Sequence, residues 1–454
     1  MDEHGGAAVR DSDSNGNIGI TARPSAPYHR ATTGKRLAML LGLGLLAAAG
    51  PARAADTLNE SLVSGKVDLQ LRYRFEYVDQ ASFAKKAHAS TLRAYLGYGT
   101  DPWHGLSLYG AIQGVKSIGY EGYNSTLNGH TKYPLVADPE TINIDQLFLQ
   151  YASPWKTTAK VGRQRIIYDN HRWIGNVVFR QNEQTYDGLR LINTSIPDLT
   201  VDYDYLTRAQ RIFGPRGVPG ANDGYSPMNS HLVRAEYKGF KPVTIIGYGY
   251  MLDFTRPATG VSTLATNRYI PTNASASSAS FGLRLIGEYP LDEMWKALYT
   301  GEYAHQTDYA DNPNDFGLNY YFIEGGAGYG PVSAKAGYEV LEGNGSYAVQ
   351  MPLATLHAFQ GWADQLLTTP ANGVEDLLFT LSGSYQGFKL TAVYHDYNFE
   401  RVSGDIGHEW DAVLSRTFYD HYTVELKVAD YNADNTTVAR LDTLKAWASF
   451  IVNY

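Results

Sequence analysis

Residues 67–77 read Val-Asp-Leu-Gln-Leu-Arg-Tyr-Arg-Phe-Glu-Tyr, with an apolar or aromatic side chain at every second position from Val67 to Tyr77. Successive side chains of a β-strand point to opposite faces, so this segment would have one apolar face and one charged face. A strand of a soluble β-sandwich can show the same alternation, but seldom over so many residues. A β-strand needs about ten tilted residues to cross a bilayer. The stretch therefore predicts a membrane-spanning strand.

The same alternation recurs along the rest of the chain, for example in residues 201–205, 281–285, 332–340 and 422–428. We expect eighteen strands, at residues 66–78, 90–99, 105–116, 141–151, 157–166, 184–192, 199–207, 231–239, 243–253, 281–289, 296–304, 320–329, 332–341, 376–385, 388–398, 409–418, 422–431 and 441–454. An even number is expected when both ends of a closed bacterial barrel face the periplasm. The predicted fold is all-β: one closed antiparallel transmembrane β-barrel of about eighteen strands.

The predicted connections alternate between short and long. The short ones are residues 100–104, 152–155, 239–242, 330–331, 386–387 and 419–421. Those between them are mostly long: 117–140, 167–183, 208–230, 254–280, 305–319 and 342–375. Outer-membrane barrels have short periplasmic turns and long extracellular loops. A soluble all-β protein has no physical reason to sort its connections in this way, so the loop lengths support the barrel independently of the strands.

The composition is consistent with a membrane barrel. Tyr is unusually frequent with 35 residues, Gly is frequent with 45, and Cys is absent. Aromatic girdles at the two membrane interfaces would account for the excess of Tyr. The lack of Cys excludes a disulfide framework and a thiolate metal site. The formal net charge of −8 argues against a nucleic-acid partner, which normally leaves a basic footprint.

The N-terminal region has the features of an export signal. Lys35 and Arg36 precede an apolar run from Leu37 to Ala49, and an Ala-x-Ala site ends at Ala54. The run is too short to cross a bilayer as a helix. We therefore expect residues 1–54 to be a signal peptide with a long polar n-region, cleaved after Ala54, and residues 55–454 to form the single barrel domain. The expected location is the outer membrane of a Gram-negative cell.

The C-terminus has the pattern of a closing barrel strand. Apolar and aromatic residues alternate from Leu444 to the terminal Tyr454. Outer-membrane barrels commonly end on such an aromatic residue, and the outer-membrane assembly machinery recognises that strand. The partners expected for this chain are therefore the membrane lipid and this machinery, together with the solute that passes through the barrel.

A barrel of about eighteen strands encloses a water-filled lumen, because its volume exceeds what side chains can fill. The alternation predicts that six arginines point inward: Arg72, Arg74, Arg93, Arg190, Arg234 and Arg284. In one interpretation they form a path for an anionic solute, since guanidinium groups are always charged and bind carboxylates in bidentate fashion. In the other they stiffen the wall by pairing with the inward acidic residues Asp68, Glu76, Asp202, Asp204, Glu236 and Glu288.

The densest polar cluster of the chain lies in residues 161–188. It reads Val-Gly-Arg-Gln-Arg-Ile-Ile-Tyr-Asp-Asn-His-Arg-Trp-Ile-Gly-Asn-Val-Val-Phe-Arg-Gln-Asn-Glu-Gln-Thr-Tyr-Asp-Gly and covers one long outer loop. Its Gly-Arg-Gln, Arg-Gln and Thr-x-Asp elements resemble the motif of the alginate-export outer-membrane barrel family. Residues 356–365, Leu-His-Ala-Phe-Gln-Gly-Trp-Ala-Asp-Gln, also resemble a recurrent loop of that family. The resemblance covers residues 60 to 454, and these two stretches carry most of its specificity.

The resemblance implies an eighteen-stranded barrel and the passage of an anionic polyuronate through an arginine-lined constriction. By this analogy five arginines would bind the carboxylates of the polymer: Arg163, Arg165, Arg172, Arg180 and Arg190. Glu183 and Asp187 would hold these arginines in place. The expected function is therefore an outer-membrane channel for an anionic polysaccharide or related anionic solutes. The alternative is a general or nutrient-uptake porin for small solutes, in which the arginine cluster is structural.

An enzymatic function is a remote alternative. His395-Asp396, Asp169 with His171, and His408-Glu409 are possible acid–base neighbours, but no Gly-x-Ser-x-Gly motif is present. Adjacent strand residues point to opposite faces, so His395 and Asp396 cannot form a dyad as neighbours. A calcium loop at Asp308, Asp311, Asn312, Asn314 and Asp315 lacks EF-hand spacing. We expect a channel that is not an enzyme, with no cofactor and no metal.

Overall fold

The computed structural model describes residues 10–12, 18–20, 55–217, 223–258, 273–434 and 440–454. The apolar run of the expected signal peptide and its cleavage site lie outside the described residues. Two short strands, β1 (Arg10–Ser12) and β2 (Ile18–Ile20), pair only with each other. All the later strands, from β3 to β20, belong to a single sheet.

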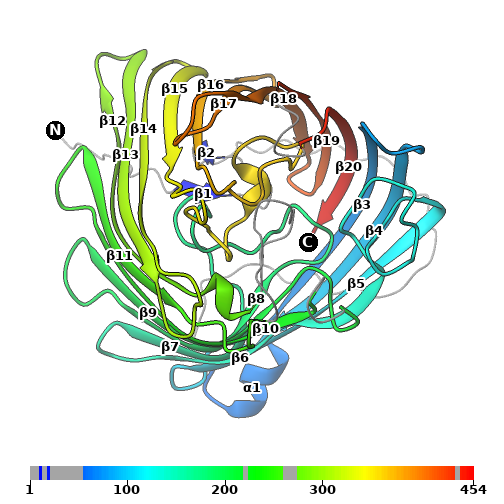
Figure 1. Ribbon diagram of the computed structural model, residues 1–454. Coiled ribbons are helices and arrows are strands. Elements are labelled where there is room, and N and C mark those ends of the chain that lie inside the picture. Colours follow the sequence, from blue (N-terminus) through cyan, green and yellow to red (C-terminus); the bar gives the residue numbers. More distant parts are fainter. Residues whose placement is uncertain (1–9, 13–17, 21–54, 218–222, 259–272, 435–439) are drawn as a thin grey trace.

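Strands β3 to β20 form one closed antiparallel barrel of eighteen strands, which confirms the predicted fold (Figure 1). Each strand pairs with its neighbours in the sequence, and β20 closes the ring on β3, with Ser449 opposite Arg74. The strands are β3 (Lys66–Gln80), β4 (Ala87–Gly99), β5 (Leu106–Gly122), β6 (Thr141–Ala152), β7 (Thr157–Gln164), β8 (Thr185–Asn193), β9 (Leu199–Gln210), β10 (Tyr225–Tyr237), β11 (Val243–Leu252), β12 (Ser278–Pro290), β13 (Trp295–Asp308), β14 (Gly317–Tyr329), β15 (Val332–Leu341), β16 (Val374–Tyr385), β17 (Phe388–Asn398), β18 (Asp405–Phe418), β19 (Tyr422–Ala433) and β20 (Thr443–Asn453).

Each predicted strand overlaps one observed strand, and the largest differences are at the end of β5, which continues past residue 116 to Gly122, and at the start of β10. The sequence predicts a strand over 231–239, whereas β10 begins at Tyr225. Proline cannot donate a ladder hydrogen bond, so Pro227 argues against a strand there. In the structure the register shifts between Pro227 and Ser230, and this irregularity lets the strand continue past the proline.

The connections differ in length at the two ends of the barrel, as predicted. At one end, here called the turn end, the connections are short, such as the two residues between Tyr329 and Val332. At the other, the loop end, they include residues 165–184 between β7 and β8 and residues 342–373 between β15 and β16. These two segments are called loop 165–184 and loop 342–373 below.

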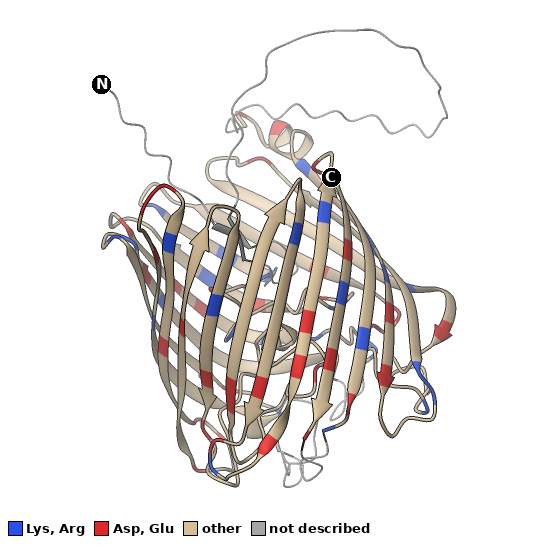
Figure 2. Ribbon diagram, turned by 90° about the horizontal axis from the view of Figure 1, so that it is seen from above, with Lys and Arg blue, Asp and Glu red and all other residues tan. Residues whose placement is uncertain are grey.

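The wall of the barrel is apolar outside and polar inside. In β3, Tyr73 and Phe75 are about one-third exposed on the outer face, whereas Arg72 and Arg74 are only 1% exposed. A soluble protein would show the opposite distribution. Figure 2 shows the tilted strands from the side, with charged positions scattered along an otherwise uncharged wall. The outer face is therefore suited to hydrocarbon and the inner face to water or to polar loops.

A short helix, α1 (Leu58–Val63), precedes the first barrel strand. Thr57 caps it, and its side chain accepts a hydrogen bond from the Glu60 backbone N–H. Among the described residues, no helix is long and apolar enough to cross a bilayer.

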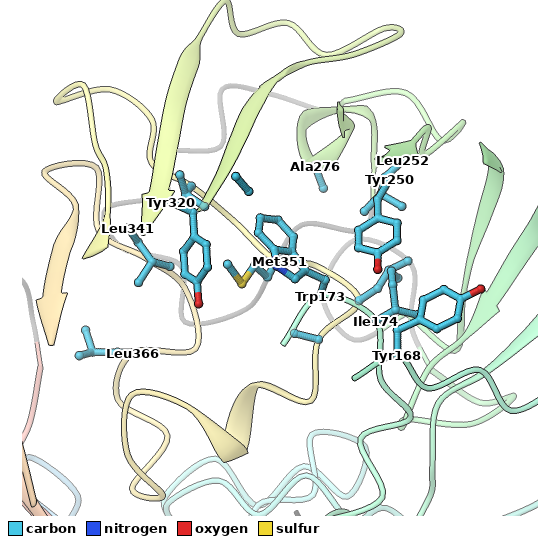
Figure 3. Packing of buried hydrophobic residues seen from close by; sticks show 14 of the residues in the cluster. Tyr168, Trp173, Ile174, Tyr250, Leu252, Ala276, Tyr320, Leu341, Met351 and Leu366 are labelled. Carbon is cyan, nitrogen blue, oxygen red and sulfur yellow. The ribbon is translucent and has the colours of Figure 1, made fainter. Parts of the chain in front are cut away.

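Both long loops fold back into the barrel, as seen through the ring in Figure 1. They bury an apolar cluster inside the lumen, to which strands from β8 round to β20 contribute residues. At its centre lies the indole of Trp173, whose ring centroid is 5.5 Å from that of Tyr320 and 6.4 Å from that of Tyr250 (Figure 3). Met351, Leu353 and other residues of loop 342–373 complete the cluster. Aromatic contacts of this kind stabilise packing beyond their buried area, so the loops form part of the folded core.

Candidate functional site

Two inward arginines of β3 hold loop 165–184 by its backbone. Arg72 donates to the carbonyl oxygen of Val178 at 2.8 Å and to that of Arg180, and to the Gln181 side chain at 2.8 Å. Arg74 donates to the carbonyl oxygen of Phe179. Both side chains are 1% exposed. These guanidinium groups therefore satisfy loop carbonyls and do not face an open pore.

Glu183 joins the same loop to the wall through ionic contacts. Its carboxylate accepts hydrogen bonds from Arg93 of β4 at 2.7 Å, from Arg165 Nε at 2.7 Å and from Asn176 at 2.8 Å. Burial alone would raise the pKa of Glu183, but Arg165 and Arg93 outweigh it and lower the pKa to about 2. The carboxylate is therefore ionised at neutral pH and neutralises part of the charge of both arginines.

The remaining arginines of the loop reach other parts of the lumen. Arg172 donates to Glu339 of β15 at 2.8 Å. Arg180 donates to Glu76 of β3 at 3.1 Å and to Asp364 of loop 342–373 at 2.9 Å. Burial lowers the pKa of Arg180, but the carboxylates of Glu76 and Asp364 outweigh it and the net direction is upward. Loop 165–184 is thus tied to the wall on several sides by buried ion pairs.

Three predicted arginines form ion pairs within or beside the wall. Arg190 of β8 lies 2.8 Å from Asp202, and Arg284 of β12 pairs with Glu302. Arg234 of β10 pairs with Glu236 at 2.6 Å and with Asp169 of loop 165–184. These pairs agree with the second interpretation given above, in which the inward arginines pair with acidic residues and stiffen the wall.

Arg163 and Asp187 are placed differently from the pore position that the family resemblance implied. They are directly opposite each other on β7 and β8, and their side chains pair at 2.7 Å. Arg163 is also directly opposite Leu147, which is 48% exposed on the outer face of β6. Directly opposite residues share a face of the sheet. The pair therefore lies on the outer face of the wall, near the loop end, and does not line the lumen.

The two long loops are joined to each other as well as to the wall. Ile174 and Leu353 form a parallel bridge, and the Gly175 N–H donates to the Leu353 carbonyl at 2.9 Å. The Thr355 hydroxyl accepts the Val177 N–H at 3.0 Å. A Cβ added to Gly175 would lie 2.3 Å from the Thr355 hydroxyl oxygen, so only glycine allows this approach.

A second buried cluster anchors loop 342–373. Asp364 accepts from His357 Nδ1 at 2.7 Å and from Lys445 of β20 at 2.6 Å, in addition to Arg180. Lys427 of β19 lies 2.8 Å from His357 Nε2. Burial, followed by the charge of Lys427, lowers the pKa of His357 well below its ordinary value, so the imidazole is neutral. The cluster fixes both loops to β19 and β20.

A cavity of about 400 Å³ remains between loop 165–184 and the turn end of the barrel. Arg165 borders this cavity, and 35% of its side chain is exposed. The side chains of Arg190 and Arg180, which were also predicted to bind solute, are only 15% and 10% exposed. Glu183 binds Nε and Nη2 of Arg165, and Nη1 has no hydrogen bond to the described residues. The cavity is lined by Asp68, Leu69, Gln70, Arg93, Tyr95, Tyr109, Arg165, Ile167, His171, Asn176, Val178, Asn453 and Tyr454.

Several residues of this site could not be selected from the sequence. Asp364, Glu302 and Glu339 are the acidic partners of predicted arginines, and strand alternation could at most have placed the last two on the inner face. Asn176 carried no signal beyond its position in the polar loop.

The residues considered above for an acid–base pair or a calcium loop make other contacts in the structure. His395 hydrogen bonds to Asp376 of the neighbouring strand at 2.9 Å and not to Asp396. His408 lies 3.2 Å from Asp434. Asn312 of the candidate calcium loop donates to the backbone carbonyl of Ser277 at 2.7 Å. Among the described residues, no group of three His, Asp or Glu side chains has metal-binding geometry.

Several solved structures have a similar fold. OccAB2 of Acinetobacter baumannii has 12% identity and a TM-score of 0.64, covering 86% of this chain and 98% of that one. OpdQ of Pseudomonas aeruginosa has 14% identity and a TM-score of 0.63, with coverages of 86% and 98%. OpdK of Pseudomonas aeruginosa, solved with vanillate, has 12% identity and a TM-score of 0.62, with coverages of 86% and 99%. At these identities the likeness concerns the fold alone.

No curated protein matches the chain. The family model described as "Alginate export" matches residues 64–307, which is more than half of the 454 residues. The matched region includes β3 to β12, nearly all of β13 and the whole of loop 165–184. The chain is therefore an outer-membrane β-barrel channel that belongs to the alginate-export family.

Proposed function

We propose that the protein is a selective channel for small carboxylate-bearing anions. These anions pass through the lumen beside loop 165–184 and bind to the guanidinium of Arg165 on the way. The turn end faces the periplasm and the loop end faces the outside of a Gram-negative cell, as in other bacterial barrels. The expected partners are outer-membrane lipid, the assembly machinery and the solute.

One observation carries this proposal: Arg165 combines a partly exposed guanidinium with a position at the cavity. Its Nη1 is free to donate to a solute carboxylate, while Glu183 holds the rest of the group in place. A single weak site of this kind lets an anion enter and leave again. The other arginines inside the lumen support the site indirectly, because they fix the loop that presents Arg165.

The filling of the lumen favours small solutes over a polymer. Both long loops are held inside the barrel by buried ion pairs and an apolar cluster. A polyuronate would need a continuous row of accessible cations, whereas Arg72, Arg74 and Arg172 are each 1% exposed. The family description nevertheless supports an anionic polysaccharide as the second candidate. Transport is expected to be passive, with no chemical step.

Ion selectivity in planar bilayers tests the proposal. The purified barrel should prefer chloride to potassium in a salt gradient at neutral pH, and uronate monomers should reduce the current. Arg165→Gln should lower the anion preference several-fold, because it removes the accessible charge beside the path. Inhibition by a long oligouronate at lower concentration than by the monomer would support the polymer instead.

The matched control is Arg416→Gln. Arg416 lies on β18 directly opposite Val424, which is 42% exposed on the outer face, and its guanidinium packs on Phe388. This change removes the same charge without altering the lumen, so selectivity should stay at the wild-type value. Cation preference in the wild type, or equal selectivity of the Arg165 and Arg416 variants, would contradict the proposal.

A further inference from the structure

One arginine of the wall has no acidic partner among the described residues. Arg208 lies two residues before the end of β9 and is exposed. Its guanidinium forms no hydrogen bond or ion pair with the described residues. It packs instead on Tyr225 of β10, with 4.4 Å between the guanidinium carbon and the centre of the ring. A charge that faces lipid without a partner is unfavourable, so an anion from outside the protein would stabilise it.

A β-bulge turns Arg208 to the outer face of the wall. Leu206 of β9 is buried in the apolar cluster of the lumen, and strict alternation would direct Arg208 to the same side. The register with β8 shifts at this point, because Gly188 is opposite Leu206 whereas Asp187 is opposite Arg208. The extra residue, Thr207, places Arg208 on the same outer face as Asp187. Bulges re-aim side chains in this way and are frequent near functional sites.

The acidic residue opposite Arg208 is already neutralised. Both carboxylate oxygens of Asp187 accept hydrogen bonds from Arg163, at 2.7 and 3.1 Å, and one of them also accepts from Gln210 at 2.8 Å. An acidic residue directly across a strand pair would ordinarily pair with an arginine. Since Asp187 is bound by Arg163, the charge of Arg208 is left for another anion.

A second arginine borders the same tyrosine ring. The guanidinium carbon of Arg256, in the connection between β11 and β12, lies 5.8 Å from the centre of the Tyr225 ring. Arg256 pairs with Asp223 and keeps 23% of its side chain exposed, and Tyr225 itself is 42% exposed. Tyrosine is enriched at membrane–water interfaces, and a lipid-facing charge costs little there. These residues therefore lie at the level of the lipid head groups, near the loop end.

From this geometry we propose that Arg208 and Tyr225 form a site on the outer face of the wall for a phosphate of lipid A, the phosphorylated glycolipid of the outer leaflet. Guanidinium binds phosphate in bidentate fashion, and the N–H donors of Arg208 are free to do so. The loop end faces the outside of the cell, so the lipid beside it belongs to the outer leaflet. The site is on the lipid side of the wall and does not depend on the solute path or on Arg165.

Barrels isolated from outer membranes test the proposal, because lipid A is confined there to the outer leaflet. The full-length barrel is extracted into a mild detergent, and native mass spectrometry counts the lipid A that stays bound to each barrel. The wild type should retain lipid A, and Arg208→Gln should retain about tenfold less, because it loses the charge-assisted hydrogen bonds to the phosphate. Arg208→Lys, which keeps the charge, should retain an intermediate amount.

The matched control is again Arg416→Gln. Arg416 also lies two residues before the end of its strand, β18, and its guanidinium carbon is 4.6 Å from the ring centre of Phe388 and 4.7 Å from that of Phe418. This arrangement is at the turn end and faces the inner leaflet, so the variant should retain as much lipid A as the wild type. Heat-modifiable migration in gels shows whether each variant has a folded barrel.

A second measurement identifies the head group. The delipidated wild-type barrel is titrated with lipid A, with lipid A from which the phosphates have been removed, and with phosphatidylglycerol. Lipid A should bind about tenfold more tightly than its dephosphorylated form, which has the same acyl chains. It should also bind more tightly than phosphatidylglycerol, because a head group with two phosphates can contact both Arg208 and Arg256.

Three results would overturn the proposal. The first is equal binding of lipid A and its dephosphorylated form to the wild type, which decides the matter even if a variant does not fold. The second is tighter binding of phosphatidylglycerol than of lipid A. The third is an unchanged retention of lipid A in a folded Arg208→Gln barrel, or a loss that Arg416→Gln shows equally.

Discussion

Glu183 shows how one residue holds together a charged loop inside a membrane barrel. It is 1% exposed and accepts hydrogen bonds from two arginines and one amide. Burying a charge is costly unless it is paired, and removing one partner leaves the others buried without compensation. The position of Arg165 at the cavity therefore depends on Glu183 as much as on the backbone of the loop.

Glu183→Gln should loosen loop 165–184, because Arg93 and Arg165 would lose their shared carboxylate. The expected cost is about 3–5 kcal/mol, as for other broken buried ion pairs. The change should appear as faster proteolysis within residues 165–184 and as noisier single-channel current. Glu288→Gln is the control, since Glu288 is 39% exposed and pairs with a partly exposed Lys296. Equal proteolysis of the two variants would contradict this role.

The pKa of Glu183 also predicts the pH at which the loop loosens. Its pKa of about 2 is below the ordinary value of 4.5, so its ionised form stabilises the folded loop. That contribution is complete above about pH 4.5 and is lost as the pH falls through 4.5 towards 2. The wild-type current should therefore stay steady from pH 7 to 5 and become noisy only at lower pH, whereas Glu183→Gln should be noisy throughout.

At the scale of elements, loops 165–184 and 342–373 act as one structural unit. They share the bridge between Ile174 and Leu353, and each supplies residues to the apolar cluster within the lumen. Each is also tied to the wall by ion pairs, through Arg172 and Asp364 among others. The width of the path is therefore set by how these two loops pack on each other.

Gly175→Ala should separate the two loops. The added Cβ would lie 2.3 Å from the Thr355 hydroxyl oxygen and 3.0 Å from the Thr355 backbone nitrogen, and overpacking of this kind typically costs about 1–3 kcal/mol. We expect a higher and more variable conductance in bilayers. Gly247→Ala in β11 is the control, because its added Cβ would meet no atom within 4 Å. An unchanged conductance in Gly175→Ala would show that the loop junction does not set the width.

At the scale of the whole molecule, hydrocarbon surrounds the barrel and sets what its outer face tolerates. Ile323, midway along β14, is 66% exposed, and Ile142, near the loop end of β6, is 81% exposed. In a soluble protein both would be unusual, but on a lipid-facing wall they are favourable. The cost of placing a charge there depends on depth in the bilayer.

Ile323→Arg should destabilise the barrel by about 2–4 kcal/mol, and Ile142→Arg by only about 0–1 kcal/mol, because the first lies near the bilayer midplane. Urea titrations of folding into lipid vesicles measure both values with the same substitution. Similar values for the two variants would contradict the assigned membrane position.

The sequence was sufficient to predict the barrel and much of its inner face. Alternation in β3 placed Arg72 and Arg74 inside and Tyr73 outside, as the structure has them. It could not place Arg163, which follows Gly162 near the end of β7 and was assigned by family resemblance alone. Its position on the outer face emerged only from the pairing with Leu147.

What the sequence determined by itself is the wall, because alternation and turn length are local properties of neighbouring residues. What only the tertiary structure decided is the content of the lumen. Arg180 contacts Asp364, 184 positions away, and Arg172 contacts Glu339, 167 positions away. No local pattern encodes such pairs, since they depend on how two loops fold back into the ring. The same packing places Arg165, His171 and Asn176 around one cavity.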